Sequence, residues 1–155
     1  MISEKLVKAF NDQIVAELWS SNLYLQMAFY LKKEGWNGAA NWMLRQSGEE
    51  KEHALKLADY AIKRGGEVKV GMIDVVPDGW GSLLDVFQNV YEHECHVSGL
   101  VNDLVDLASA ERDKATQDFL WGFVREQVEE EDSALMIVER LKRAGEAGAF
   151  SVDAE

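Results

Sequence analysis

Two short pairs of polar residues in the chain have the spacing of metal ligands on a helix. Glu50 and His53 stand three residues apart, and Gln127 and Glu130 repeat the same spacing. Residues three apart lie on one face of a helix, so each pair can direct both side chains toward one point. Carboxylate and imidazole groups that converge in this way predict a binding site for a divalent transition metal.

An internal repeat joins these pairs to two further glutamates. Glu17 precedes Glu50 by 33 residues, and Glu94 precedes Gln127 by the same 33 residues, so the two halves repeat at an offset of 77. Two equivalent helical hairpins would therefore bring equivalent side chains to one height. A register shift of one residue would turn any single acid toward solvent, but the agreement of four segments favours the inner position.

Four helical segments are needed to position these residues. When each segment is written at alternating steps of four and three, it shows an apolar stripe. Acids, alone or with His or Gln, interrupt each stripe near its middle. Gly35, Gly65 and Gly145 follow three of the segments as stop signals. The predicted helices cover residues 3–33, 38–64, 82–110 and 113–144.

A long connection separates the second and third segments. Residues 67–79 read EVKVGMIDVVPDG, with β-branched residues, Gly71 and Pro77, and they show no helical period. When extended, this stretch reaches about 43 Å, and a helix of about 28 residues is about 42 Å long. The segment can therefore run the full length of a bundle. The predicted fold class is all-α: a four-helix bundle with one long crossover between the second and third helices.

The bundle is expected to occupy residues 1–145 as one domain, followed by a short C-terminal tail at 146–155. This tail is too short and too interrupted by glycine for a full fifth helix, which is predicted to be short or absent.

The composition excludes several classes of partner. The 155 residues carry a formal net charge of −12 and one cysteine, Cys95. This acidity argues against binding to nucleic acid or to an anionic membrane surface, and it is compatible with attracting cations. The chain has no apolar run long enough to span a membrane and shows no secretory signal. We therefore expect a cytoplasmic protein.

The predicted inner acids need a compensating charge. Buried carboxylates on one inner face repel one another, but two divalent metals bring a charge of about +4. That charge matches Glu17, Glu50, Glu94 and Glu130. The ligand set is too rich in oxygen for a structural zinc site, and the chain lacks the EF-hand pattern of calcium sites. Fe(II) and Mn(II) both suit the mixture of carboxylates and one imidazole.

The sequence also resembles the ferritins, and among them the bacterial non-haem ferritins. The resemblance covers nearly the whole chain, and ligand spacing, crossover and helix lengths agree together. The stretches that carry it are residues 11–17, SSNLYLQM at 20–27, GEEKEH at 48–53, IDVVPDGW at 73–80 and REQVEEE at 125–131.

This resemblance implies a hollow shell of 24 identical subunits that oxidises Fe(II) with O2, or with peroxide, and stores a ferric mineral. Each subunit would hold two iron ions, plus a third at a weaker position. The first iron would bind Glu17, Glu50 and His53. The second would share Glu50 and use Glu94 and Glu130. Gln127 would orient oxygen, Tyr24 would stand beside the centre, and the third position would use Glu49, Glu126 and Glu129.

The sequence departs from related families at several positions. Bacterioferritins bind haem through a methionine at the position that Lys51 occupies, so no haem is expected. Bacterioferritins also have histidine where this chain has Glu130. The acidic channel of animal ferritins is not predicted either, because the matching positions hold Gln117 and Leu120.

Two other classes of protein remain open from the sequence. A four-helix bundle can be an interaction module, although its inner acids would then need Lys or Arg partners, and the apolar stripes contain none. The second alternative is a di-manganese or O2-activating enzyme that stores no metal. His93 and His96 lie off the stripe of Glu94, so we expect them at the surface or at a subunit contact.

Overall fold

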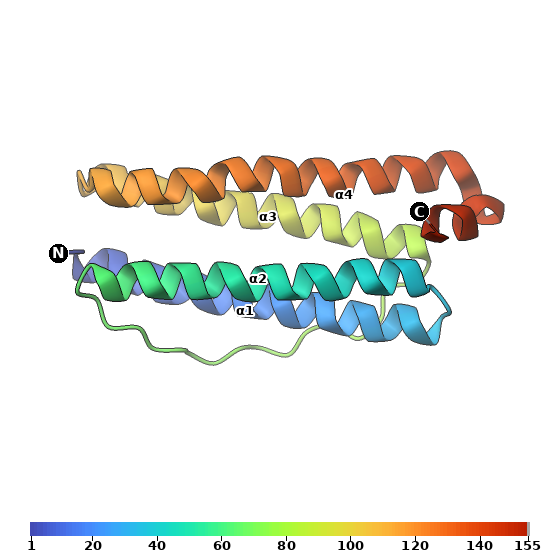
Figure 1. The fold of residues 1–155 in the computed structure, drawn as a ribbon, viewed down its shortest axis with the longest axis horizontal. Coiled ribbons are helices and arrows are strands. Elements are labelled where there is room, and N and C mark those ends of the chain that lie inside the picture. The colour runs from blue at the N-terminus through green and yellow to red at the C-terminus, as the bar shows by residue number, and fades with distance from the viewer. Residues whose placement is uncertain (155) are drawn as a thin grey trace.

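The computed structural model describes residues 1–154, which form four helices and no strand. Helices α1 and α2 make one antiparallel hairpin, and α3 and α4 make the other (Figure 1). The two hairpins pack into one bundle, which confirms the predicted fold. The helices are α1 (Glu4–Lys33), α2 (Asn37–Lys63), α3 (Leu83–Ala110) and α4 (Lys114–Ala154).

Serine side chains cap the start of two of the helices. The hydroxyl of Ser3 accepts a hydrogen bond from the Leu6 N–H of α1. Ser82 forms a capping box with Asp85, in which each side chain accepts from the backbone N–H of the other residue. Such caps satisfy N–H groups that a helix leaves unpaired at its start.

The long crossover follows the α1–α2 hairpin from end to end (Figure 1). Near its start, the Asn11 amide donates to the Glu67 carbonyl and accepts from the Lys69 N–H. Near its end, the Tyr30 hydroxyl donates to the Gly81 carbonyl and accepts from the Gly81 N–H. Both ends are therefore attached to α1, and α2 and α3 run parallel.

Two apolar clusters fill the bundle on either side of a polar layer. One cluster includes Leu23, Met27 and Met43, and the other includes Phe10 and Leu57. Burying each such side chain contributes roughly 1.5–3 kcal/mol. This apolar packing offsets the cost of placing polar groups between the two clusters. The buried polar and charged residues include Glu17, Gln46, Glu50, His53, Glu94 and Gln127.

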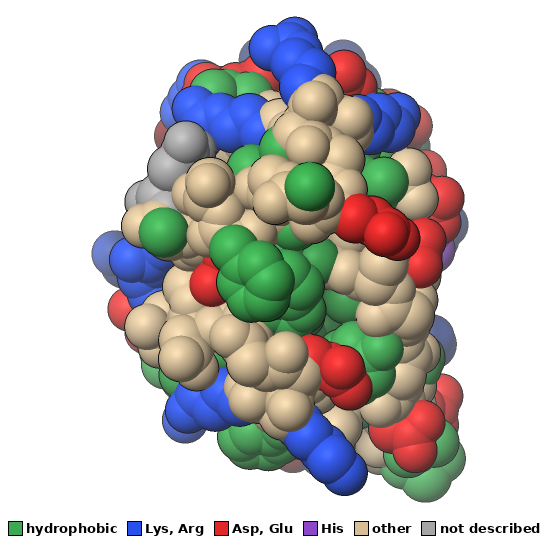
Figure 2. Space-filling view, turned by 90° about the vertical axis from the view of Figure 1, so that its right-hand side faces the viewer, with side chains coloured by type: hydrophobic (Ala, Val, Ile, Leu, Met, Phe, Trp, Pro, Cys, Tyr) green, Lys and Arg blue, Asp and Glu red, His purple; other side chains and the backbone are tan. Residues whose placement is uncertain are grey.

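Helix α4 breaks at Gly145, whose φ of 66° lies in the left-handed region that favours glycine. Beyond this break a short helical segment folds back across the end of the bundle (Figure 1). The rings of Phe150 and Trp36 meet there with centroids 4.6 Å apart. Hydrophobic side chains gather at the centre of this end (Figure 2). The fifth helix is therefore short, as expected, and Glu155 of the predicted tail lies outside the described residues.

None of the described helices is both long enough and apolar enough to cross a membrane.

Candidate metal centre

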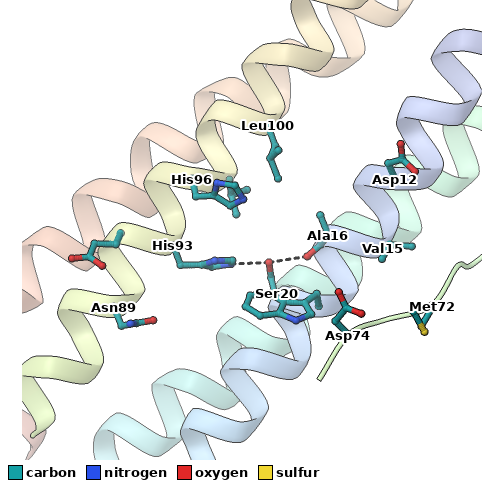
Figure 3. A pocket seen from close by; sticks show the side chains of 13 residues that line it. Asp12, Val15, Ala16, Ser20, Met72, Asp74, Asn89, His93, His96 and Leu100 are labelled. Carbon is teal, nitrogen blue, oxygen red and sulfur yellow. Dashed lines mark hydrogen bonds between the residues drawn. The ribbon is translucent and has the colours of Figure 1, made fainter. Parts of the chain in front are cut away.

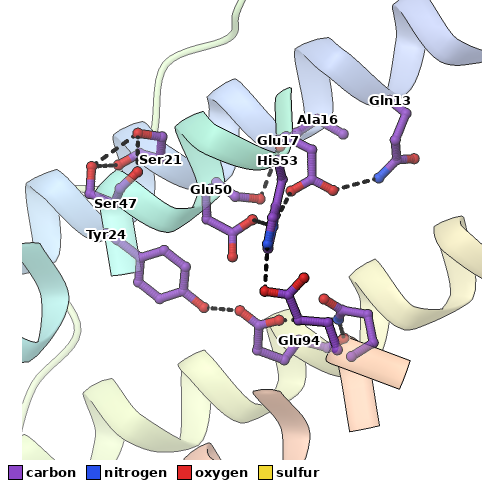
Figure 4. Close-up of polar contacts among 12 residues, drawn as sticks. Gln13, Ala16, Glu17, Ser21, Tyr24, Ser47, Glu50, His53 and Glu94 are labelled. Atoms are coloured by element: carbon purple, nitrogen blue, oxygen red, sulfur yellow. Dashed lines mark hydrogen bonds and ion pairs between the residues drawn. The ribbon is translucent and has the colours of Figure 1, made fainter. Parts of the chain in front are cut away.

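Side chains from all four helices converge midway along the bundle. Figure 4 shows those of Glu17, Glu50, His53 and Glu94. Glu17 of α1 meets Glu50 and His53 of α2, and Glu50 also meets Glu94 of α3 and Glu130 of α4. Within each of these groups of three, the potential ligand atoms all lie within 4.8 Å of one another. Glu50 belongs to both groups. The structure thus brings together the residues that the sequence predicts for two adjacent metal positions.

The centre is almost closed to solvent. The exposed fractions are 2% for Glu17, 1% for Glu50 and 1% for Glu94. One carboxylate oxygen of Glu17 (Oε2) and one of Glu50 (Oε1) have no hydrogen-bond partner among residues 1–154. A buried carboxylate oxygen without a partner is costly, so these atoms require a proton or a cation. Oxygen donors with one imidazole fit Fe(II) or Mn(II).

The pKa values show how strongly these groups interact without a cation. Burial and the neighbouring Glu17 raise the pKa of Glu50 to about 10. Burial alone would raise the pKa of Glu17, but the close approach of Glu50 and His53, together with the hydrogen bond from Gln13, lowers it overall. Burial and the charge of Glu94 raise the pKa of Glu130 to about 7. At neutral pH the cluster therefore retains protons that a bound cation would replace.

His53 presents its two ring nitrogens to different partners. Its Nδ1 faces the cluster, 3.4 Å from Glu50 Oε2 and 3.8 Å from Glu17 Oε2. Its Nε2 lies 2.9 Å from Glu126 Oε1 on α4. Burial would lower the pKa of His53, but its carboxylate neighbours raise it to about 11. The ring also packs edge-on against Phe123.

Tyr24 and Gln127 both hold Glu94. The buried Tyr24 hydroxyl donates a hydrogen bond to Glu94 Oε1 (Figure 4). The Gln127 amide donates to Glu94 Oε2 at 3.2 Å and also to the Glu94 backbone carbonyl. Burial and the charge of Glu94 raise the pKa of Tyr24, so its hydroxyl stays protonated and serves as a donor. These contacts fix the direction of the Glu94 carboxylate.

The acids predicted for a third metal position do not form a close group among the described residues. Glu126 instead contacts His53, although Glu49 and Glu126 are near enough to raise the pKa of Glu130. Glu129 is exposed. Their role as a third set of ligands stays a prediction.

Two supporting contacts were missed by sequence reasoning. Gln13 donates to Glu17 Oε1 at 2.9 Å, and its position four residues before Glu17 on the same helix is the signal that could have revealed it. His93, expected at the surface or at a subunit contact, is half-buried and its Nε2 contacts Ser20 Oγ at 2.8 Å. The Ser20 hydroxyl donates to the Ala16 carbonyl, so it accepts from His93.

His93 lines a cavity of about 570 Å³ between α1 and α3 (Figure 3). Burial and the nearby His96 lower the pKa of His93 to about 4, so its ring is neutral. His96 also lines this cavity, and Asp12 lies across from it on α1. The ring of His93 lies beside that of Tyr24, which puts the inner wall of the cavity next to the metal centre.

Comparisons with known proteins agree with this geometry. A family model described as Ferritin, the ferritin-like domain, matches residues 7–144. A bacterial non-heme ferritin of Bacteroides fragilis is 64% identical over 155 residues, which are 100% of this chain and 98% of that protein. A probable bacterial non-heme ferritin-like protein of Haemophilus influenzae is 36% identical, over 99% of this chain and 94% of its own length.

Solved structures agree in both fold and sequence. An open pore ferritin from the hyperthermophilic archaeon Archaeoglobus fulgidus matches with a TM-score of 0.97 and 46% identity, over 99% of this chain and 96% of that chain. With a family model that spans most of its length and a 64% identical relative, the chain belongs to the ferritin family.

Proposed function

We propose that this protein stores iron and oxidises Fe(II) with O2 at a di-iron centre inside each subunit. The observation that carries the proposal is the pair of ligand groups that share Glu50 in the interior of the bundle. Two Fe(II) ions on these groups would neutralise the four carboxylates. They would also occupy the unpartnered oxygens of Glu17 and Glu50.

The first iron would bind Glu17, Glu50 and His53, and the second would bind Glu50, Glu94 and Glu130. Two adjacent Fe(II) ions can each give one electron to O2. Two protons then complete the reduction to hydrogen peroxide, and no superoxide is released. Carboxylate oxygen stabilises Fe(III) more than Fe(II), which favours oxidation. Peroxide is the alternative oxidant.

The surrounding residues have distinct roles in this scheme. Tyr24 and Gln127 direct the Glu94 carboxylate toward the second iron, since both donate hydrogen bonds to it. Gln13 donates a hydrogen bond to Glu17 and directs its carboxylate toward the first iron in the same way. Glu49, Glu126 and Glu129 are the proposed ligands of a third, weaker iron position.

A shell of 24 subunits is proposed from membership of the ferritin family. The outer faces of the crossover and α1 support assembly, because they expose large apolar side chains: Met72 is 84% exposed, Val75 is 91% exposed and Phe29 is 51% exposed. Exposed apolar groups of this size are typical of surfaces that contact another protein. A cytoplasmic location stays a prediction.

Anaerobic titration with Fe(II), followed by O2, tests the proposed activity. The expected result is two tightly bound Fe(II) per subunit and a transient di-ferric absorbance after O2 is added. Glu50→Ala and His53→Ala should lose tight binding, whereas Glu67→Ala on the crossover, whose side chain is exposed, serves as the control. Unchanged oxidation in both site variants would disprove the assignment.

A further inference from the structure

The contact between His53 and Glu126 joins a predicted ligand of the first iron position to a predicted ligand of the third. His53 belongs to the first iron position, and Glu126 is predicted only for the third. In the structure, Glu126 Oε1 lies 2.9 Å from His53 Nε2, within ordinary hydrogen-bond distance. The link joins α2 of one hairpin to α4 of the other.

This contact decides which nitrogen of His53 is free to bind metal. A neutral imidazole carries one proton, and an ionised carboxylate can only accept a hydrogen bond. When a metal displaces the proton of Nδ1, the remaining ring proton is on Nε2, where Glu126 Oε1 accepts it, and the Nδ1 lone pair binds the metal. Nδ1 is the nitrogen that faces Glu17 and Glu50. The Glu126 contact therefore selects the tautomer that the first iron position requires.

The same contact also sets the orientation of the ring. His53 is nearly buried, with 4% of its side chain exposed, whereas 40% of the Glu126 side chain is exposed. Phe123 packs against the ring but offers no hydrogen bond. A carboxylate behind a metal-binding histidine raises its basicity and fixes its orientation, and its loss typically weakens metal binding about 10–100-fold.

We propose that Glu126 is a positioning residue of the first iron position, where it holds His53 through Nε2 so that Nδ1 points at the metal. This inference rests on the proposed function, since it needs His53 to be a ligand. It assigns Glu126 a role that Glu49 and Glu129 do not share.

Anaerobic titration of the assembled protein with Co(II) tests the proposal. Co(II) stands in for Fe(II) without being oxidised, and its visible absorption changes with the ligands that bind it. Glu126→Ala should weaken the first Co(II) about 10–100-fold and change its spectrum. Glu126→Gln keeps a carbonyl oxygen that accepts from Nε2, so it should retain most of the affinity. Glu126→Asp keeps the charge but is too short to reach His53, so it should behave like Glu126→Ala.

Three further variants test whether the effect of Glu126 is specific to the first iron position and depends on His53. Asp132→Ala, an exposed acid on α4, is the neutral control. Glu129→Ala should weaken only the later, weaker binding. In the His53→Ala background, Glu126→Ala should cause no additional loss at the first position, because its effect passes through His53.

The outcomes are distinguishable. If Glu126→Ala leaves the affinity and spectrum of the first Co(II) unchanged, or if Glu126→Gln is as impaired as Glu126→Ala, the positioning role is wrong. If His53→Ala also leaves the first Co(II) unchanged, the ligand assignment under the proposed function fails as well. Loss in Glu126→Ala and Glu126→Asp, with retention in Glu126→Gln, supports the hydrogen bond rather than the charge.

Discussion

Asp153 caps the beginning of helix α2, which starts more than a hundred residues earlier in the chain. Its Oδ1 accepts a hydrogen bond from the Ala39 N–H at 2.7 Å, and its Oδ2 accepts from the Gly38 N–H at 3.3 Å. Trp36 at the N-cap position of α2 makes no side-chain capping bond. The end of the chain therefore supplies a cap that the local sequence does not, and it ties the C-terminal segment to α2.

Replacing Asp153 by alanine should remove this cap and destabilise the start of α2 by about 1 kcal/mol, the usual cost of losing an N-cap. Asp153→Asn is the control, because asparagine caps helices as well as aspartate does. Hydrogen exchange at the amides of residues 38–40 measures the effect directly. Equal protection in Asp153→Ala and the unmodified protein would show that the cap contributes nothing.

Gly38→Ala should displace the C-terminal segment. A Cβ at position 38 would lie 1.8 Å from the backbone carbonyl oxygen of Asp153, a distance that no real contact allows. Gly48→Ala is the matched control, since a Cβ there meets nothing within 4 Å, and alanine is favoured in a helix. We expect faster proteolysis after Gly145 in Gly38→Ala and no change in Gly48→Ala. Equal resistance of the two variants would contradict the close approach.

Asp113 should make the stability of the protein sensitive to acid. It accepts a hydrogen bond from the Thr116 N–H and pairs with Arg64 at 3.3 Å. Burial would raise the pKa of Asp113, but the bonds from Thr116 and Arg64 lower it overall. A lowered pKa in the folded state means that the stabilisation is present above the unfolded pKa of about 3.9. It is then lost as the pH falls through the folded pKa.

The substitution Asp113→Asn tests whether the charge of Asp113 stabilises the protein at neutral pH and loses this effect in acid. The amide retains the oxygen that caps α4 but loses the charge that pairs with Arg64. The free energy of unfolding should therefore be lower in Asp113→Asn than in the unmodified protein at pH 7. The difference should shrink below pH 4. A difference in the free energy of unfolding that stays constant from pH 7 to pH 3 would contradict this prediction.

Tyr24→Phe should weaken the second metal position and spare the first. The variant removes the hydroxyl that donates to Glu94 and leaves the apolar contacts of the ring in place. A hydrogen bond to a charged group contributes about 1.5–3 kcal/mol, so about a tenfold or larger loss at the second position is expected. Anaerobic metal titration measures both affinities.

Tyr30→Phe is the matched control for Tyr24→Phe, because, within the described part of the chain, its hydroxyl bonds to the backbone of Gly81 at the end of the crossover. It should lower the stability of the protein without changing metal affinity. Equal metal affinities in the two variants would exclude a role for Tyr24 at the second position.

Much of this architecture was predictable because it depends on local signals. The caps at Ser3 and Ser82 and the break at Gly145 act within a few residues. The spacing of Glu50 and His53 follows from the helical period. The length of the crossover dictated which helices run parallel. These features lead to the four helices and to the meeting of the inner glutamates.

The remaining features depend on contacts between distant segments. Glu126 lies on the same helix as Glu129 and Glu130, and only the approach of α2 to α4 makes it a partner of His53. His93 is paired with Ser20 because α1 and α3 pack together at that point. No local pattern indicates that Asp153 reaches the start of α2.

The central claim is that two metal ions bind side by side and share Glu50. The most direct measurement is anomalous diffraction from a crystal soaked anaerobically in Fe(II). The account predicts two peaks in each subunit, one bordered by Glu17, Glu50 and His53 and the other by Glu50, Glu94 and Glu130. Iron found only outside the bundle, or the same two peaks in a Glu50→Ala crystal, would contradict it.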